Sequence, residues 1–223
     1  MSTSTSTSTS TSFSTIPDAL EALRQGRFVL VLDDEDRENE GDLVVAAEFA
    51  DADAINFCAR FGRGLVCCAL APEIIDRFGL PLMVPQALNG SGFGTAFTLS
   101  VEAREGVTTG ISAADRARTV EVLIDPDAGP EDIVAPGHMF PLRAREQGVL
   151  ERGGQTEASV DLCRLAGLRP GAVICEVMND DGTMARRDDL FAFAERHGGM
   201  PVVTVAALKT YREENEGVTL AAE

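Results

Sequence analysis

Two apolar runs flank a dense acidic segment in the stretch RFVLVLDDEDRENEGDLVVAAEF, residues 27–49. Seven of the ten residues between Leu32 and Leu43 are acidic, and the other three are an arginine, an asparagine and a glycine. The flanking runs are short, uninterrupted and rich in valine and leucine, which is typical of buried β-strands. We therefore expect a strand-loop-strand unit in which the loop carries the acids.

The rest of the chain alternates between predicted helices and predicted strands. Because no internal repeat and no clear linker interrupts this order, we expect an α/β (α+β) fold, a single domain with a mixed β-sheet and flanking helices in layers. The domain is expected over residues 14–214, between a disordered Ser/Thr-rich tail at 1–13 and a flexible C-terminal tail at 215–223. Helices are predicted near 15–25, 52–60, 72–78, 112–124, 157–166, 188–197 and 206–214, and further strands near 65–70, 97–103, 139–143, 172–178 and 201–205.

The composition limits the classes of partner. The formal net charge is −17, which argues against nucleic acids and anionic membrane surfaces, because both require a basic surface. The total charge does not exclude small anions, since a few local arginines, helix N-termini and a divalent ion can hold a phosphate. A small anionic molecule therefore remains a possible ligand.

The cysteines and the hydropathy indicate a cytoplasmic protein. The five cysteines form no CxxC motif and lie within apolar runs, so we expect reduced, buried side chains. No apolar run approaches the roughly 18 residues of a membrane span, and no secretory signal pattern is present.

The acidic segment has two interpretations from its residues alone. Arg37 relieves the repulsion among the neighbouring carboxylates, and Gly41 is expected to allow a tight turn. A magnesium ion would relieve that repulsion further, because Mg²⁺ prefers oxygen ligands and needs only one or two from the protein. The alternative is a solvated acidic loop. An EF-hand calcium loop is excluded, because Asn39 stands where that motif requires glycine.

A second candidate site is the segment RGGQTEASVDL, residues 152–162. Two glycines after Arg152 allow close approach to the backbone, and Thr156 is predicted to cap the helix that follows. Backbone N–H groups, the helix dipole and a guanidinium would then converge on one anion. The alternative is an ordinary turn before a helix.

Two further residues stand out singly. His138 lies between a Pro-Gly turn and a predicted strand, where it is either a structural residue or a general acid or base. Glu176 interrupts the apolar strand AVICEVM, where a carboxylate needs a partner or a chemical role.

Together, five motifs resemble those of the 3,4-dihydroxy-2-butanone 4-phosphate synthase family of riboflavin biosynthesis. They are DDEDRENEGDL (33–43), GVTTGISAADRARTV (106–120), PGHMFPLRA (136–144), RGGQTEASVDLCRLAG (152–167) and CEVMNDDGTMAR (175–186). The resemblance extends from about residue 16 to residue 211 and implies the stand-alone form of the enzyme. It also implies a lyase that converts ribulose 5-phosphate to L-3,4-dihydroxy-2-butanone 4-phosphate and formate by enolisation, dehydration and skeletal rearrangement.

The resemblance further implies a homodimer with active sites at the subunit interface and two Mg²⁺ ions per site, replaceable by Mn²⁺. Glu38 would be the shared metal ligand, and Gln155 occupies the position of the second one. The implied catalytic residues are His138, Glu176 and Glu40. The implied substrate-binding residues are Arg37, Glu38, Asp42, Thr109, Arg152, Gly153, Gly154, Gln155, Thr156 and Glu176.

Two residues depart from the family pattern. The family has a metal-binding histidine at the position of Gln155, and a carboxamide oxygen can bind Mg²⁺ but carries no charge and moves no proton. Phe93 stands where relatives carry a hydroxyl or imidazole side chain. These departures leave two alternatives open: a divergent paralogue acting on a pentulose phosphate, or an inactive homologue that binds a sugar phosphate.

Overall fold

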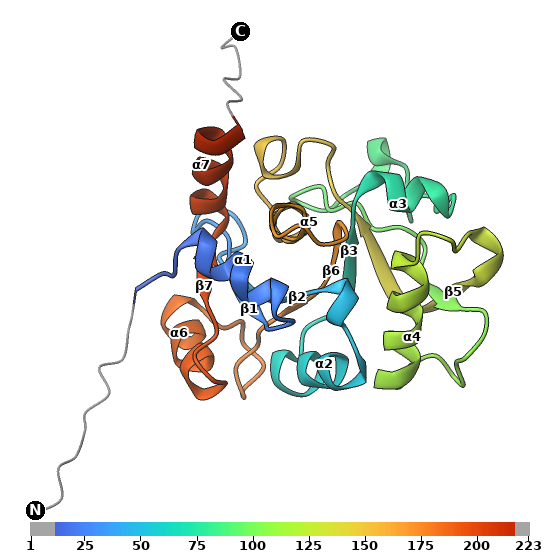
Figure 1. Cartoon of the computed structure of the whole chain (residues 1–223), viewed down its shortest axis with the longest axis horizontal. Coiled ribbons are helices and arrows are strands. Elements are labelled where there is room, and N and C mark those ends of the chain that lie inside the picture. The colour runs from blue at the N-terminus through green and yellow to red at the C-terminus, as the bar shows by residue number, and fades with distance from the viewer. Residues whose placement is uncertain (1–11, 217–223) are drawn as a thin grey trace, which may run out of the picture.

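A seven-stranded mixed sheet runs through the part of the chain that the computed structural model describes, residues 12–216 (Figure 1). Neighbouring strands follow the order β4-β5-β3-β6-β2-β1-β7. The pairs β1/β7 and β3/β5 are parallel, and the other four are antiparallel. The strands are β1 (Val29–Leu32), β2 (Gly41–Ala46), β3 (Cys67–Leu70), β4 (Val101–Ala103), β5 (Ile133–Arg143), β6 (Gly171–Glu176) and β7 (Val202–Thr204).

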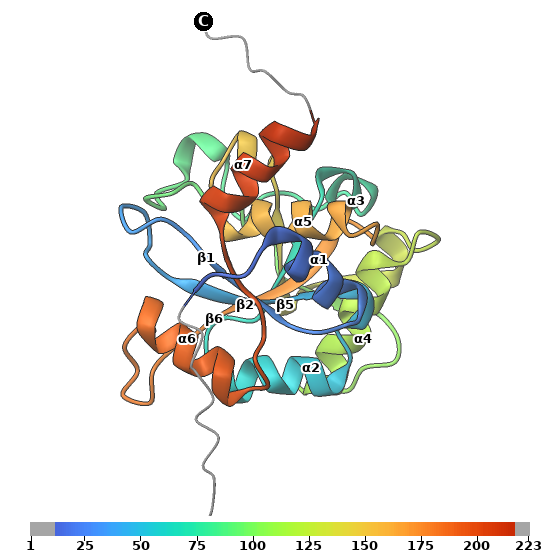
Figure 2. The ribbon, with the colours of Figure 1, turned by 60° about the vertical axis from the view of Figure 1, so that its left-hand side comes forward.

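Helices cover both faces of this sheet, with α1, α5 and α7 on one side and α2, α4 and α6 on the other (Figures 1 and 2). The α-helices are α1 (Ile16–Arg24), α2 (Ala52–Phe57), α3 (Pro72–Arg77), α4 (Ala113–Ile124), α5 (Gln155–Leu165), α6 (Arg187–Arg196) and α7 (Val205–Glu216). Shorter helical turns are η1 (Ala47–Phe49), η2 (Cys58–Gly62), η3 (Gln86–Leu88), η4 (Pro130–Asp132) and η5 (Gly148–Leu150). The predicted layered α/β fold is confirmed.

Strand β1 shows why the central strands are apolar throughout. Leu30 and Leu32 belong to the core on one face of the sheet, which also contains Leu190 of α6. Val29 and Val31 belong to the core on the other face, which contains residues of α1, α5 and α7. Because successive side chains of a strand point to opposite faces, a sheet covered on both sides requires a continuous apolar run.

Two predicted helices begin at side-chain N-caps. The Thr15 hydroxyl accepts the backbone N–H of Asp18 at 3.3 Å at the start of α1. The Ser112 hydroxyl accepts the backbone N–H of Asp115 at 3.1 Å at the start of α4. Both bonds satisfy N–H groups that have no partner within the helix.

Strands β4 and β5 differ from the prediction. The strand expected at 97–103 is regular only over 101–103, and the strand expected at 139–143 begins at Ile133. A Pro-Gly pair lies inside β5, which is why the sequence indicated a turn there. The pairing is irregular at that point, since Val101 pairs with Met139 while the next residue, Glu102, pairs with Val134. The intervening residues of β5 form a bulge, which tolerates proline and glycine.

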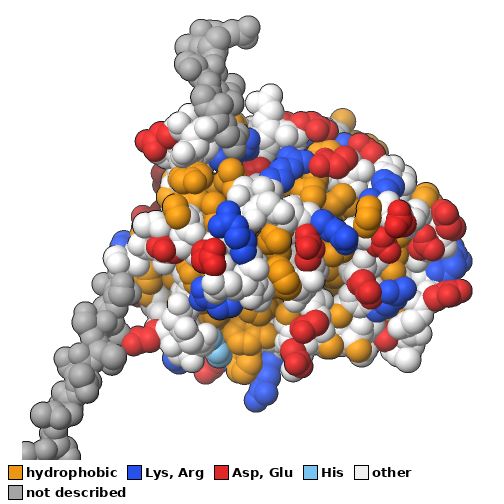
Figure 3. All heavy atoms as spheres, in the orientation of Figure 1, with side chains coloured by type: hydrophobic (Ala, Val, Ile, Leu, Met, Phe, Trp, Pro, Cys, Tyr) orange, Lys and Arg blue, Asp and Glu red, His pale blue; other side chains and the backbone are white. Residues whose placement is uncertain are grey.

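The predicted tails, 1–13 and 215–223, lie mostly outside the described residues and remain predictions. Within residues 12–216, no helix has the length and apolar character that a bilayer span requires. Acidic and basic side chains are interspersed over the face shown in Figure 3. The charge of any one site is therefore decided by the groups that line it.

Candidate functional site

The acidic loop between β1 and β2 is organised around Asp33, whose side chain is buried. Its carboxylate accepts hydrogen bonds from the backbone N–H groups of Glu38 (3.0 Å) and Glu40 (2.8 Å). It also accepts one from the guanidinium of Arg37 at 2.8 Å. Asp33 therefore fixes the path of the loop. The sequence did not indicate this role, because Asp33 is one of seven acidic residues in the same segment.

The turn of this loop is made by Asn39, which has a left-handed backbone (φ 53°). Gly41 lies in β2, paired with Leu32, so the prediction that Gly41 makes the turn is wrong. A glycine is needed there for packing, because a Cβ atom at Gly41 would come within 2.5 Å of the Leu190 side chain. Asparagine is one of the few residues besides glycine that adopts the left-handed conformation readily.

Arg37 connects this loop to α5. Its Nη1 atom donates to Asp33 (2.8 Å), to Glu38 (2.6 Å) and to the side-chain oxygen of Gln155 (2.8 Å). Its guanidinium also lies 4.9 Å from the ring centre of Phe93. Burial alone would lower the pKa of Arg37, but the hydrogen bond with Asp33 and the charge of Glu38 raise it. The residue is therefore a fixed cation between two carboxylates and a carboxamide.

The strand register brings two carboxylates together, because Asp42 of β2 pairs with Glu176 at the end of β6. Burial, followed by the charge of Glu176, raises the pKa of Asp42 well above its usual range. Burial also raises the pKa of Glu176, whose carboxylate accepts the backbone N–H of Leu65 at 2.8 Å. Burial and the charge of Glu38 raise the pKa of Glu40. These groups hold protons more readily than ordinary carboxyls, which suits proton transfer near neutral pH.

Helix α5 begins two residues earlier than predicted. Gly154 is the N-cap, with an extended backbone, and its carbonyl accepts the N–H of Ala158 at 2.9 Å. Thr156 is buried in the first turn, so the prediction that it caps the helix is wrong. Glycine gives no side-chain cap, which leaves the first N–H groups of α5 available to a ligand.

Arg152 lies at this helix start and is tied to the protein. Its Nη1 atom is 2.5 Å from the Glu157 carboxylate, and its Nη2 atom donates to the Thr95 hydroxyl at 2.9 Å. Glu157 is almost fully buried, and burial raises its pKa although the charge of Arg152 opposes this. The structure thus brings Arg152 and Gly154 together, while Gly153 is exposed beside them.

These elements enclose a cavity of about 150 Å³. Two buried polar atoms in its wall, Oδ1 of Asp42 and the side-chain nitrogen of Gln155, have no hydrogen-bond partner. Buried polar atoms of this kind destabilise the protein unless a ligand or water binds them. The Asp42 oxygen and the Gln155 nitrogen are therefore an acceptor and a donor for a polar ligand. The lining residues are Arg37, Glu38, Asp42, Cys67, Thr95, Phe97, Leu142, Arg152, Gln155, Thr156, Ile174 and Glu176.

The donor set of this cavity suits a hard divalent cation that takes most of its ligands from water and substrate. Among the described residues no group of three or more His, Cys, Asp or Glu side chains is arranged as a complete metal centre. Mg²⁺ does not need one, because it usually keeps several waters and takes one or two protein carboxylates. Glu38 and Asp42 offer such carboxylates, whereas the Gln155 oxygen faces Arg37. The residues present therefore fit Mg²⁺ on the carboxylate side of the cavity.

Two predicted site residues lie elsewhere in the same chain. His138 is exposed on the β5 bulge, where its Nδ1 atom meets the Glu102 carboxylate. Thr109 is exposed in the loop before α4. Neither belongs to the residues that line the cavity of one chain. Glu40, Gly153 and Gly154 are also absent from the lining, although they lie in the same two segments as residues that form it.

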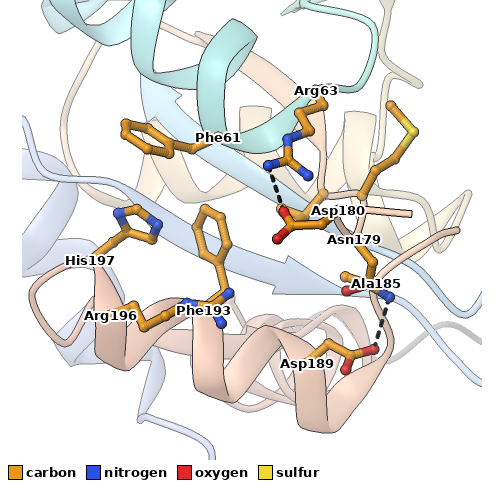
Figure 4. A pocket seen from close by; sticks show the side chains of 11 residues that line it. Phe61, Arg63, Asn179, Asp180, Ala185, Asp189, Phe193, Arg196 and His197 are labelled. Carbon is orange, nitrogen blue, oxygen red and sulfur yellow. Dashed lines mark hydrogen bonds and ion pairs between the residues drawn. The ribbon is translucent and has the colours of Figure 1, made fainter. Parts of the chain in front are cut away.

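A larger cavity of about 390 Å³ lies between the end of β6 and α6 (Figure 4). Four of its polar side chains pair within the cavity: Arg63 is 2.6 Å from Asp180, and Asn179 donates to Asp189 at 3.3 Å. One wall is aromatic, with His197 packed against phenylalanine rings. Its polar lining is thus largely satisfied from within, unlike that of the cavity beside the acidic loop.

Comparison with known proteins resolves the family. A family model described as 3,4-dihydroxy-2-butanone 4-phosphate synthase matches residues 17–211. The chain belongs to this family. The match includes all five motifs and every predicted site residue, so the resemblance seen in the sequence is confirmed.

Curated relatives of this synthase family are similar over most of the chain. A 3,4-dihydroxy-2-butanone 4-phosphate synthase of Pseudomonas syringae is 59% identical over 204 residues, which are 92% of this chain and 54% of the relative. One of Cronobacter sakazakii is 52% identical over 92% of this chain and 93% of the relative. The chain thus spans about half the length of the Pseudomonas relative and nearly all of the Cronobacter one.

Solved synthase structures share the fold. A 3,4-dihydroxy-2-butanone 4-phosphate synthase in complex with two magnesium ions has a TM-score of 0.86 and 45% identity, over 92% of this chain and 99% of that one. RibBX, a two-domain synthase from A. baumannii, has a TM-score of 0.86 and 50% identity, over 91% of this chain and 59% of that one.

Proposed function

We propose that this chain is a magnesium-dependent lyase that converts D-ribulose 5-phosphate to L-3,4-dihydroxy-2-butanone 4-phosphate and formate. The observation that carries the proposal is the cavity beside the acidic loop, where the unpaired atoms of Asp42 and Gln155 lie among carboxylates and arginines. A polyhydroxy phosphate complements such a wall, because its hydroxyls donate and accept and its phosphate pairs with guanidinium groups. The family membership supports this choice of substrate.

In this proposal Glu38 and Gln155 contact Mg²⁺, and Mn²⁺ can replace it. The bound metal supplies Lewis-acid polarisation of the ketose carbonyl. Glu38 is the anchor, because its charged carboxylate has a second oxygen besides the one that accepts from Arg37, whereas the neutral Gln155 has a single oxygen, to which Arg37 already donates. A related synthase structure is in complex with two magnesium ions. A second ion in this cavity would take its ligands from the Gln155 oxygen or from the substrate.

The remaining residues divide between binding and proton transfer. Arg37, Asp42 and Thr109 bind the hydroxyl-bearing part of the sugar. The phosphate lies at the start of α5, against the segment Arg152, Gly153, Gly154 and Thr156, where uncapped N–H groups favour an anion. Glu176 and Glu40, whose pKa values are raised chiefly by burial, move protons together with His138.

We also propose a homodimer in which the partner chain supplies His138 and Thr109 to this cavity. Apolar side chains are exposed beside the site residues: Leu65 follows the glycine next to Glu176, and Ile111 follows the Thr109-Gly110 pair. Such neighbouring exposed apolar groups suit burial against a second copy. Other exposed apolar residues of the same kind are Met83, Val84, Leu88, Phe93 and Leu99.

A mixing experiment tests this arrangement. Glu38→Ala and His138→Ala should each be inactive as homodimers, because each lacks one half of every site. Random exchange of equal amounts should restore about one quarter of wild-type activity, since half of the dimers then carry one intact site. No recovery after verified subunit exchange would contradict the shared site.

Formate release tests the reaction itself. Ribulose 5-phosphate consumption and formate appearance, measured together, should be equal in the presence of Mg²⁺ and absent with a chelator. The bond between Gln155 and Arg37 favours one competing function, an inactive homologue that binds the sugar phosphate. That function would be supported by ribulose 5-phosphate binding without turnover, with activity gained in Gln155→His. Consumption without equal formate would instead indicate a divergent paralogue.

We further propose a cytoplasmic location for the protein. All five cysteines are free and buried, which suits a reducing compartment.

A further inference from the structure

The bulge of β5 brings His138 against a carboxylate that the sequence motifs did not single out. Glu102 of β4 follows Val101, which pairs with Met139, yet Glu102 itself pairs with Val134. The residues of β5 between those two pairs are displaced from the ladder, and His138 is the last of them. Its Nδ1 atom meets Oε1 of Glu102, while much of the imidazole remains exposed.

Close packing holds the Glu102 side chain in this position. A Cβ atom at Gly110 would collide with the Glu102 carboxylate, and a Cβ atom at Gly137 would collide with its Cγ and with the Val101 backbone. The Gly110 backbone N–H is in turn bound to the Asp115 carboxylate at 3.0 Å. The side chain of Glu102 is only 15% exposed, compared with 46% for His138. The carboxylate is therefore fixed, and the imidazole is held on one edge only.

We propose that Glu102 is a positioning residue for His138 in the proposed lyase reaction. The ionised carboxylate accepts the Nδ1–H of the neutral imidazole, which selects the Nδ1–H tautomer and leaves the Nε2 lone pair directed outward. The inference rests on the proposed function only because that reaction requires His138 to transfer a proton. The contact between Glu102 and His138 does not depend on the proposed function.

The chemical consequence is a defined base. The Nε2 lone pair takes a proton from substrate bound in the partner's cavity, which forms an N–H bond and leaves the electron pair on the substrate. The resulting imidazolium is stabilised by the negative charge of Glu102, and return of the proton restores both groups. Gly110, which follows Thr109, packs against the same carboxylate, so Thr109 and His138 are presented to that cavity as one unit.

The chain contains only two histidines, so nitrogen NMR of ¹⁵N-histidine-labelled protein gives two resolvable imidazoles. At a pH where both are neutral, wild-type His138 should have its proton on Nδ1. Glu102→Ala should shift His138 towards the Nε2–H tautomer that free histidine favours. His197, which lies among phenylalanine rings, is an internal control for folding and should be unchanged. The variant His197→Gln assigns the signals.

Kinetics separate a positioning role from a structural one. Glu102→Ala should lower kcat by about 10²-fold, with KM for ribulose 5-phosphate changed less than about 2-fold. Glu102→Gln keeps the shape of the side chain but removes its charge, and its amide nitrogen can donate to Nδ1, so this variant should also lose the Nδ1–H tautomer and lower kcat. Glu105→Ala, which removes an exposed acid from the same region, should leave both readouts unchanged.

Wild-type His138 in the Nε2–H form would overturn the inference, as would a Glu102→Ala variant with unchanged tautomer and unchanged kcat. If the wild-type protein releases no formate from ribulose 5-phosphate, the proposed reaction fails. The tautomer measurement still tests the pair in that case.

Discussion

Replacement of Asp33 by alanine should destabilise the protein and loosen its acidic loop. The buried carboxylate accepts two backbone N–H groups and one guanidinium N–H, at 2.8–3.0 Å. A hydrogen bond to a charged group contributes about 1.5–3 kcal/mol, so three of them set an upper bound near 5–9 kcal/mol. The loop N–H groups regain water when the carboxylate is lost, and Arg37 keeps its bond with Glu38. We therefore expect the free energy of unfolding to fall by about 2–4 kcal/mol.

Urea unfolding at a fixed protein concentration measures this change, since dimerisation would make stability depend on concentration. Asp36→Ala is the matched control, because it removes an exposed acid from the same loop and should alter stability by less than about 0.5 kcal/mol. Manganese affinity should fall in Asp33→Ala, since Glu38 loses the bond that fixes its backbone. A loss below about 1 kcal/mol together with unchanged manganese affinity would refute the role assigned to Asp33.

Three further predictions concern the cavity wall. Glu38→Gln should lower kcat by about 10²–10³-fold without loss of fold, checked by circular dichroism beside the kinetic assay; wild-type turnover would contradict its role. Arg152→Ala should weaken phosphate binding. It should also destabilise the fold by about 3–5 kcal/mol, because it leaves the buried Glu157 carboxylate without its ion-pair partner. The double variant with Glu157→Gln should recover the stability but not the affinity for phosphate. Asp42→Asn should raise stability at neutral pH. Burial and the charge of Glu176 raise the pKa of Asp42, so Asp42 binds its proton more tightly in the folded state than in the unfolded state. The free energy of unfolding of the wild type therefore falls as the pH rises above about 3.9, the pKa of Asp42 in the unfolded chain. Urea unfolding of Asp42→Asn and wild type should thus converge below about pH 4, and parallel curves across pH would contradict the raised pKa.

The fold class was predictable because its evidence is local. The continuous apolar run of β1 and the capping residues Thr15 and Ser112 each determine structure within a few residues of themselves. The acidic loop was placed correctly between two strands for the same reason. The start of β5 was missed, because its Pro-Gly pair is tolerated only through an irregular pairing with β4, and a partner strand leaves no trace in the local pattern.

The site was predictable as a set of residues but not as a geometry. The motifs named Asp42 and Glu176, yet their proximity depends on the β2/β6 register, which no single segment encodes. Asp33 and Glu102 were missed, since one is hidden among similar acids and the other lies outside any recognisable motif. The bond between Arg37 and Gln155 joins side chains 118 residues apart, so sequence alone could not show that the carboxamide oxygen is already engaged.

Anomalous scattering from crystals grown with Mn²⁺ and ribulose 5-phosphate tests the central claim most directly. We expect a manganese peak within ligand distance of the Glu38 carboxylate, about 2.0–2.2 Å, with sugar oxygens completing its coordination and the phosphate at the start of α5. Crystals of Glu38→Gln should lack that peak. A fully occupied sugar with no manganese beside Glu38, or manganese bound only elsewhere, would contradict the account.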